Sequence, residues 1–416
     1  MKTADPELMR AINRFHVMDA IRRFGPIARV EISDRTELSP TTVSAITAAL
    51  LDDGLIVPRA EGAVRDAARG RPKVMLELNP DAAFVVGVKL APDQITVATT
   101  NFRADVLKSL TLPIRIDRQP VSVIADLVED GVRRCIADAD LAIDKISGVC
   151  VGLPGVIERD AGLCRQSPIF RERDVPFAAE LKSRLAIDAT VDSDVNLVTL
   201  AEHWFGMGRG LDDFIVVSVE HTLGLGVIHN GELFRGANGI GPDLGELAVR
   251  PPPPGGGNGK TPPGGGNGVT RLAEVASETA ILDEVAAILG ETGADPAPRD
   301  GAGMARVIQL AEGGDQRILG VLTSAGEALG FAIANLIALF APPKVILAGA
   351  ALDGGTLIVS PLRATVAALT PENLADVADI VVHQWGDDMW ARGAAAMTLR
   401  ELYGAPWTTN GAASPR

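Results

Sequence analysis

The chain has 416 residues, of which 47% are apolar and 22% charged, and its formal net charge is −14. This length predicts two or three domains with a sizeable core. Only three cysteines occur (Cys135, Cys150 and Cys164), which excludes a disulfide-framed secreted fold and a four-cysteine zinc site. Four charged side chains in the first ten residues argue against a signal peptide, and the longest apolar stretch (328–341) is too short to span a membrane. We therefore expect a cytoplasmic protein without membrane contact.

Charge is distributed unevenly along the chain. Residues 1–79 carry a net charge of +1, whereas the remaining residues carry −15. This asymmetry predicts an acidic body that carries a differently built N-terminal unit. We expect the units to span residues 1–79 and 80–403, followed by a flexible tail over 404–416. The 16 aromatic residues are too few for single-strand binding by base stacking.

The N-terminal unit has the pattern of three helices followed by a hairpin. Apolar residues at three- and four-residue spacing predict a helix over 5–24, which Gly25-Pro26 ends. A short helix over 28–36 follows, with Val30 expected to point inward. Ser39 is a good N-cap for a third helix that begins at Pro40. Runs at 55–57 and 74–76 predict two strands joined by a basic loop.

This order predicts a winged helix-turn-helix that binds double-stranded DNA. Short hydroxyl side chains at a helix N-terminus can approach base edges and phosphates in the major groove, and basic wing residues can reach phosphates. A helical cap domain with a solvated basic loop is the alternative. The DNA-binding candidates are Ser39, Thr41, Thr42, Ser44 and Thr47 on the third helix, and Arg59, Arg69, Arg71 and Lys73 in the wing.

The body alternates strands and helices. Three apolar runs over 84–89, 95–100 and 106–112 predict consecutive antiparallel strands, which a helix over 121–138 and a buried strand over 146–153 follow. A second set of strands is predicted over 214–219, 225–229, 345–348 and 379–384. A long helix over 316–340 and a final helix from about 390 accompany them. This repetition predicts two α/β lobes with a cleft between them.

Several motifs together resemble the ROK family of repressors and sugar kinases. They are Leu38-Ser39-Pro40-Thr41-Thr42-Val43-Ser44, Gly70-Arg71-Pro72, Gly152-Leu153-Pro154-Gly155, Asp192-Ser193-Asp194-Val195-Asn196 and the loop over 230–239. The resemblance extends to about residue 400. It implies an α/β fold in which an N-terminal winged helix-turn-helix precedes a two-lobed actin-like, sugar-kinase (ribonuclease H-like) body.

The chain departs from the family at the sites of phosphate binding. Lys89 replaces an acidic residue in the turn that cradles ATP in the family's kinases, and the glycines of that turn are missing. Glu220 falls in the second phosphate loop, where a carboxylate repels a nucleotide phosphate. We therefore expect no catalytic residues, no cofactor and no kinase activity, although Asp194 lies where the family has its catalytic base.

The family's zinc site is also absent from the sequence. Glu246 replaces its histidine, and its cysteine segment has become a tandem repeat within 251–268. Gly259-Lys260-Thr261 imitates a phosphate-binding loop, but the prolines around it favour a flexible surface loop. We expect no bound metal.

A changed sugar pocket is the candidate effector site. By the resemblance, Ser193, Asp194, Asp243 and Glu246 occupy sugar-binding positions. Carboxylates accept hydrogen bonds from hydroxyls, and three of them would also suit an amino-bearing ligand. We expect these three to line one pocket between the lobes, with Asp243 and Glu246 on one side of a helical turn. A vestigial pocket is the alternative.

The sequence thus predicts a repressor of carbohydrate-related genes. Its expected partners are double-stranded operator DNA and a small carbohydrate-like effector, and it is expected to act as a homodimer or homotetramer. Two alternatives remain. One is a sugar kinase with a fused DNA-binding domain, and the other is a regulator that no longer responds to a ligand and is controlled by a protein partner.

Overall fold

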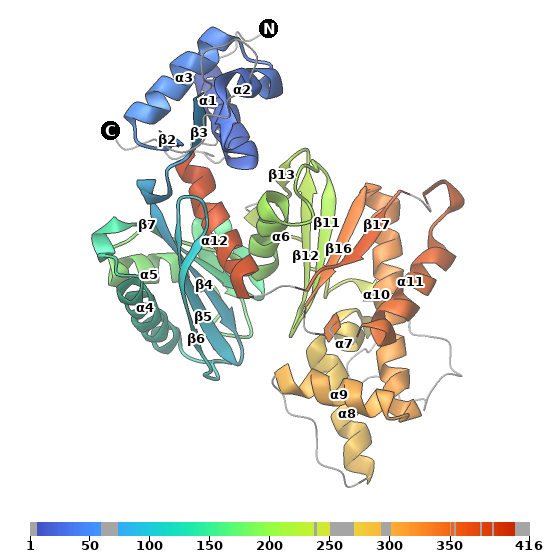
Figure 1. Cartoon of the computed structure of the whole chain (residues 1–416). Helices are drawn as coiled ribbons and strands as arrows, with labels where there is room; N and C mark the ends of the chain where they lie inside the picture. The colour runs from blue at the N-terminus through green and yellow to red at the C-terminus, as the bar shows by residue number, and fades with distance from the viewer. Residues whose placement is uncertain are drawn as a thin grey trace.

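A computed structural model describes residues 6–59, 74–236, 239–249, 270–292, 301–349, 351–352, 355–374, 377–384 and 387–403. The tandem repeat at 251–268 and the expected tail over 404–416 lie outside these residues. Within them the chain forms a small N-terminal unit and two α/β lobes, with the unit seated above the junction of the lobes (Figure 1).

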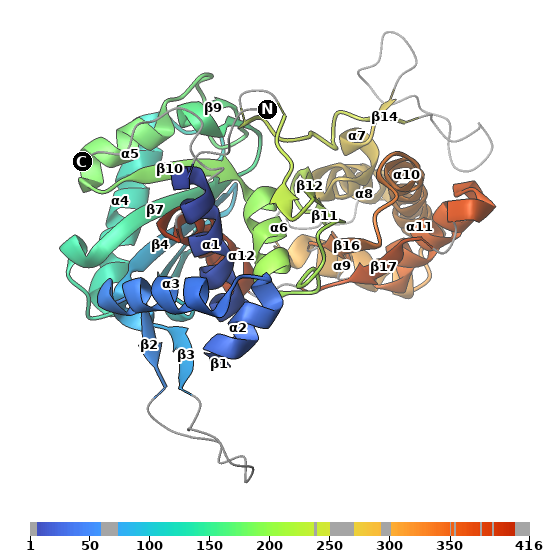
Figure 2. The same cartoon turned by 90° about the horizontal axis from the view of Figure 1, so that it is seen from above.

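The N-terminal unit is three-helical with a small sheet. Helices α1 (Pro6–Phe24), α2 (Arg29–Thr36) and α3 (Pro40–Asp52) pack around a shared apolar core. Strands β1 (Ile27–Ala28), β2 (Ile56–Pro58) and β3 (Met75–Leu78) form an antiparallel sheet in the order β1-β3-β2. The β2–β3 hairpin projects from the unit (Figure 2). This is the arrangement of a winged helix-turn-helix, as the sequence pattern predicts.

The expectation that Val30 points inward is wrong. Its side chain is 52% exposed, whereas Ile32 is buried against the other helices. Successive residues of an α-helix are about 100° apart, so Val30 and Ile32 point in nearly opposite directions. Because Ile32 fills the core, Val30 faces away from it.

The first lobe is a five-stranded sheet in the order β10-β7-β4-β5-β6. Strands β4 (Phe84–Ala91), β5 (Gln94–Asn101) and β6 (Val106–Leu112) are antiparallel, and β7 (Ile146–Leu153) and β10 (Ala189–Ser193) extend the sheet in parallel. Helices α4 (Val121–Asp138) and α5 (Phe177–Leu185) cover one face, and α12 (Asp387–Leu402) covers the other.

The second lobe repeats this topology in the order β13-β12-β11-β16-β17. Strands β11 (Phe214–Val219), β12 (Leu223–His229) and β13 (Glu232–Leu233) are antiparallel, and β16 (Lys344–Ala348) and β17 (Asp379–Val382) run parallel to β11. One face packs on α8 (Glu278–Thr292), α9 (Gly301–Glu312), α10 (Gln316–Phe340) and α11 (Thr356–Leu369), and the other on α6 (Asp194–Phe205). The two repeats confirm the predicted two-lobed body.

Smaller elements join these layers. They are β8 (Val156–Glu158), β9 (Leu163–Gln166), β14 (Ala248–Val249), β15 (Thr270–Arg271) and α7 (Ala273–Ala276). Helix α10 is apolar and long enough to cross a membrane, but more than half of its most apolar window is buried in the core of the second lobe. Helices α6 and α12 lie side by side between the two sheets and fill the middle of the body (Figure 1).

Candidate DNA-binding and effector sites

The N-terminal turn of α3 presents hydroxyl groups to solvent. Ser39 caps the helix by accepting a hydrogen bond from the Thr42 backbone N–H at 3.1 Å. Ser39, Thr41 and Ser44 are exposed, and Thr42 is half-buried. Free N–H groups at a helix N-terminus, together with short hydroxyl side chains, can donate to phosphates and base edges. The surface therefore has the chemistry of a recognition helix.

Thr47 does not belong to this surface, contrary to the prediction. Its side chain is fully buried; its hydroxyl accepts a hydrogen bond from Arg29 Nε at 2.8 Å and donates to the Ser44 carbonyl at 3.2 Å. Thr47 lies four residues after Val43 on the inward face of α3, so it packs against α2. Its role is to hold Arg29 at the start of α2.

The wing begins with an exposed arginine. Arg59 directly follows β2, and its backbone N–H donates to the Met75 carbonyl at 3.0 Å, which ties it to the hairpin. The other predicted wing contacts, Arg69, Arg71 and Lys73, lie outside the described residues.

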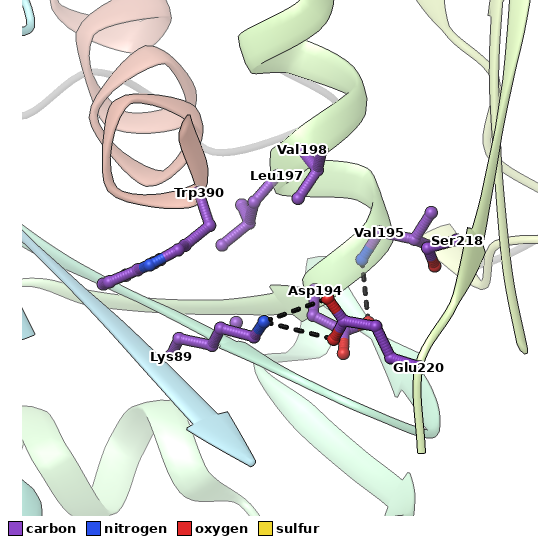
Figure 3. A pocket seen from close by; sticks show the side chains of 9 residues that line it. Lys89, Asp194, Val195, Leu197, Val198, Ser218, Glu220 and Trp390 are labelled. Carbon is purple, nitrogen blue, oxygen red and sulfur yellow. Dashed lines mark hydrogen bonds and ion pairs between the residues drawn. The ribbon is translucent and has the colours of Figure 1, made fainter. Parts of the chain in front are cut away.

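A narrow cavity lies between the two lobes, with room for about one water molecule. Side chains from both sheets and from the first turns of α6 and α12 converge on it (Figure 3). Its lining consists of Lys89, Gly152, Asp194, Val195, Leu197, Val198, Ser218, Glu220 and Trp390.

An ion pair crosses the cavity. Lys89 Nζ, from β4 of the first lobe, lies 3.2 Å and 3.1 Å from the two carboxylate oxygens of Glu220, which follows β11 of the second lobe. Both side chains are half-buried. The two residues that the sequence predicts to depart from the phosphate loops of ROK kinases therefore contact each other and join the lobes.

A second set of charged groups lies beside this pair. His221 Nδ1 is 3.3 Å from Glu278 Oε2, and its Nε2 is 3.9 Å from Asp93 Oδ1, in the turn between β4 and β5. Burial raises the pKa of Glu278, and Glu220 and Asp93 add to this shift, whereas His221 opposes it. The turn at 91–94 and the loop at 220–222 thus meet through polar contacts.

Asp194 is the acidic group at the centre of the cavity. It begins α6, and its Oδ1 accepts a hydrogen bond from the Val195 backbone N–H at 2.7 Å. Burial raises the pKa of Asp194 to about 6; Glu220 contributes to the increase and Lys89 opposes it. A carboxyl with this pKa changes its charge near neutral pH and can both accept and donate hydrogen bonds.

The structure does not bring all predicted effector residues together. Ser193 is next to Asp194, with its hydroxyl 3.4 Å from Asp194 Oδ1. Asp243 and Glu246 are exposed, are absent from the cavity lining, and lie in a segment of turns instead of a helix. Glu246 pairs with Arg271 at 2.8 Å, which draws its carboxylate away from the cleft. Gly241 lies against Asn196, so this segment does pass the first turn of α6.

Sequence reasoning missed Trp390 and Ser218 as cavity residues. The pattern predicts a final helix near Trp390, but nothing in the sequence places that helix against α6. Among the described residues, no group of three or more His, Cys, Asp or Glu side chains is arranged to hold a metal ion. The three cysteines are buried, and burial raises the pKa of Cys150 to about 12, which makes its thiol unreactive.

Two α/β lobes of identical topology, with a winged helix-turn-helix before them, define the class of this protein. The ROK family matches residues 85–401, so the chain belongs to the ROK family. It is 27% identical over 366 residues to the xylose repressor of Caldicellulosiruptor bescii, a match that covers 86% of this chain and 88% of that one. The regulator NagC of Escherichia coli strain K12 is 25% identical over 86% of each chain.

Solved structures show the same fold. A ROK family transcriptional regulator, described as a homologue of the E. coli MLC protein, matches with a TM-score of 0.76 at 23% identity and covers 95% of this chain and 97% of that one. The ROK hexokinase of Thermus thermophilus matches with a TM-score of 0.58 at 21% identity; it covers 77% of this chain and 99% of its own. Kinases thus share the fold over about three quarters of this chain, and the regulator shares it over nearly all.

Proposed function

We propose that the chain is a sequence-specific DNA-binding transcriptional regulator, a repressor of carbohydrate-related genes, and that it has no enzymatic activity. The observation that carries this proposal is the Lys89–Glu220 ion pair. It joins the two positions at which the family's kinases hold nucleotide phosphates, on a chain that also carries an exposed recognition helix.

Binding to duplex DNA is supported by the surface of the N-terminal unit. Ser39, Thr41, Thr42 and Ser44 lie at the start of α3, and Arg59 lies at the base of the wing. We propose residues 1–79 as the DNA-binding domain, with Arg69, Arg71 and Lys73 as phosphate contacts, and residues 80–403 as the sensing body. Helix-turn-helix proteins read two half-sites as dimers, so we propose a homodimer or homotetramer that acts in the cytoplasm.

The absence of kinase activity follows from the electrostatics of the cleft. A phosphate donor needs close backbone contacts and positive or neutral surroundings. Here the Glu220 carboxylate occupies the second loop and engages Lys89, so a nucleotide would have to displace an ion pair and face a carboxylate. Without a bound phosphate donor, Asp194 alone cannot promote the transfer of a phosphoryl group.

The cleft remains suited to a small polyhydroxylated or amino-bearing effector. Asp194 and Ser193 offer hydrogen-bonding groups at the N-terminus of α6, and Trp390 offers an apolar face. We propose Asp243 and Glu246 as further contacts from the segment that passes α6, reached when an effector occupies the cleft. The relative named xylose repressor favours a carbohydrate.

Two measurements on the full chain test this proposal. Selection from a random duplex pool at low salt should enrich one motif, and failure to retain any duplex would refute the regulator function. A thermal-shift screen of sugars, amino sugars and sugar phosphates should identify the effector, because a ligand that binds the native state raises its melting temperature. A body that responds to no small molecule, on a chain that binds DNA, would favour control by a protein partner.

A further inference from the structure

Two helices connect the cleft with the DNA-binding unit. Asp194 begins α6 and Trp390 lies in the first turn of α12, and both line the cavity (Figure 3). At the far ends, Trp204 is in the last turn of α6, and Tyr403 directly follows α12. At 1.5 Å per residue, Trp204 lies about 15 Å along the axis from Asp194. The unit formed by α1, α2 and α3 sits above these far ends (Figure 1).

The two helices pack mainly on different lobes. Helix α12 packs on β4, β5 and β7 of the first sheet. Helix α6 directly follows β10 and contacts β7 of that sheet, but it makes most of its sheet contacts with β11 and β12 of the second. They cross closely at Gly393, where an added Cβ would clash with the Leu197 carbonyl oxygen. A change in the angle between the lobes must therefore move α6 against α12 about this crossing.

Trp204 and Tyr403 meet across this boundary between the lobes. Their rings are stacked, with centroids 5.6 Å apart and planes 8° from parallel. The Tyr403 hydroxyl donates to the Phe102 carbonyl at 2.9 Å, which fixes it to the first lobe. Trp204 is thus attached to the second lobe through α6, and Tyr403 is attached to the first lobe through α12.

One arginine of the DNA-binding unit contacts this stack through its charge, beside apolar residues of α1 that share a core with Trp204 and Tyr403. The Arg22 guanidinium of α1 lies 4.1 Å from the centroid of the Trp204 ring, and its Nη1 donates to the Trp204 carbonyl at 3.2 Å. Asp19 holds the same guanidinium, whose side chain is only 4% exposed. A desolvated cation over an aromatic face is a strong and geometrically specific contact.

We propose that the Trp204–Tyr403 stack transmits the arrangement of the lobes to the DNA-binding unit, with Arg22 as the positioning residue that couples α1 to it. This inference rests on the proposed function of the cleft as an effector site. A sugar is far larger than the cavity, so it can enter only when the lobes separate and Lys89 leaves Glu220. That movement shifts Trp204 relative to Tyr403. It therefore changes how α1 packs on the body.

The experiment uses the full chain and needs no effector. Glu220→Gln removes the charge that holds the lobes together at Lys89. The rate of amide hydrogen exchange in α1 then reports how firmly this helix packs on the body. We expect Glu220→Gln to change exchange in the last turns of α1 about fivefold or more, the lower range for allosteric coupling. In an Arg22→Met background the same substitution should change it less than twofold. Arg14→Met, which removes an exposed ion pair of α1 with Asp53, is the matched control and should keep the full effect.

Two results would overturn the proposal. One is no change in α1 when Glu220→Gln is made with Arg22 intact; the other is an equal change with and without Arg22. Exchange in β5 and β16, which lie beside β4 and β11 in the two sheets and do not carry the ion pair, verifies that each variant is folded. Tyr403→Leu tests the stack from the other lobe if Arg22→Met does not fold. Because exchange is measured without DNA, failure to bind any duplex would refute the proposed function alone.

Discussion

Lys89 and Glu220 face each other across the interlobe cleft, with Lys89 Nζ 3.1 Å from Glu220 Oε2. Each is unfavourable for a kinase by itself, since one replaces an acidic group and the other adds a carboxylate at a phosphate loop. Together they neutralise each other in a half-buried site, which lowers the cost of burying either charge. The pair therefore forms a contact between the lobes at two positions where the resemblance to ROK kinases predicts phosphate binding.

The first prediction concerns phosphate transfer. The full chain should not phosphorylate hexoses or amino sugars with ATP, because Glu220 repels the nucleotide and the turn at Lys89 lacks the glycines for close backbone contact. A coupled assay for ADP release, with an active hexokinase as positive control, measures this. Turnover that depends on both sugar and Asp194 would show that the chain is an enzyme.

The second prediction concerns DNA. Replacing Arg69 and Arg71 by Ala should weaken binding to all duplexes alike and make the salt dependence shallower by ~0.9 per lost phosphate contact. Changing Thr41 or Thr42 should instead alter which sequence is preferred, because base edges carry the sequence information. Titrations at several salt concentrations distinguish these effects, with Arg115→Ala on the body as control. An unchanged slope in the double variant would remove the wing from the interface.

The third prediction concerns the junction of the two units. Tyr403→Phe should lower the free energy of unfolding by about 1–2 kcal/mol, because it leaves the buried Phe102 carbonyl without its donor. The denaturant midpoint should fall with little change in slope. Ser183→Ala, which removes an exposed hydrogen bond from a hydroxyl to a backbone carbonyl, should have a much smaller effect. Equal losses in the two variants would argue that the hydroxyl contributes nothing specific.

The fourth prediction concerns metal. The purified protein should contain no stoichiometric zinc, because Glu246 replaces the histidine of the family's site and pairs with Arg271, and the segment 251–268 contains no cysteine or histidine. Elemental analysis after dialysis without chelator measures this. One zinc per chain would contradict our interpretation of residues 243–274.

Much of the fold could be predicted because its signals are local. The helices over 121–138 and 316–340 and the strand over 146–153 begin and end where the apolar periodicity and breakers place them. Thr47 and Val30 were assigned to the wrong faces because helical spacing gives the angle between residues but not which neighbour each face meets.

The site was less predictable because its contacts are long-range. Lys89 and Glu220 are 131 positions apart, and only the pairing of the two lobes brings them together. Sequence motifs marked each as a departure from the family, but no pattern indicates that one compensates the other. Trp390 enters the cavity because α12 returns to the first sheet from the end of the chain, which is a matter of topology. Asp243 and Glu246 were expected on a helical turn, and the glycines and Pro242 around them favour the irregular turns observed.

The last prediction concerns the pH dependence set by Asp194. Burial raises its pKa in the folded protein to about 6, above the 3.8 of a solvated aspartate, so between these values the native state binds a proton that the unfolded state releases. Stability should therefore fall as the pH rises through this window, and the buried charge should be fully unfavourable above it. Asp194→Asn removes that cost.

The variant should match the wild type near pH 4 and exceed its free energy of unfolding at pH 7.5 by on the order of 1–3 kcal/mol, at about 1.4 kcal/mol per pKa unit and with allowance for partial exposure. Denaturant titrations at pH 4, 5, 6 and 7.5 measure this, with Asp144→Asn, at an exposed position outside the cleft, as control. Asp194→Asn should also need a higher effector concentration for the same thermal shift. A stability difference that does not grow with pH would mean that Asp194 is solvated. An unchanged effector response of Asp194→Asn would mean that the effector binds elsewhere.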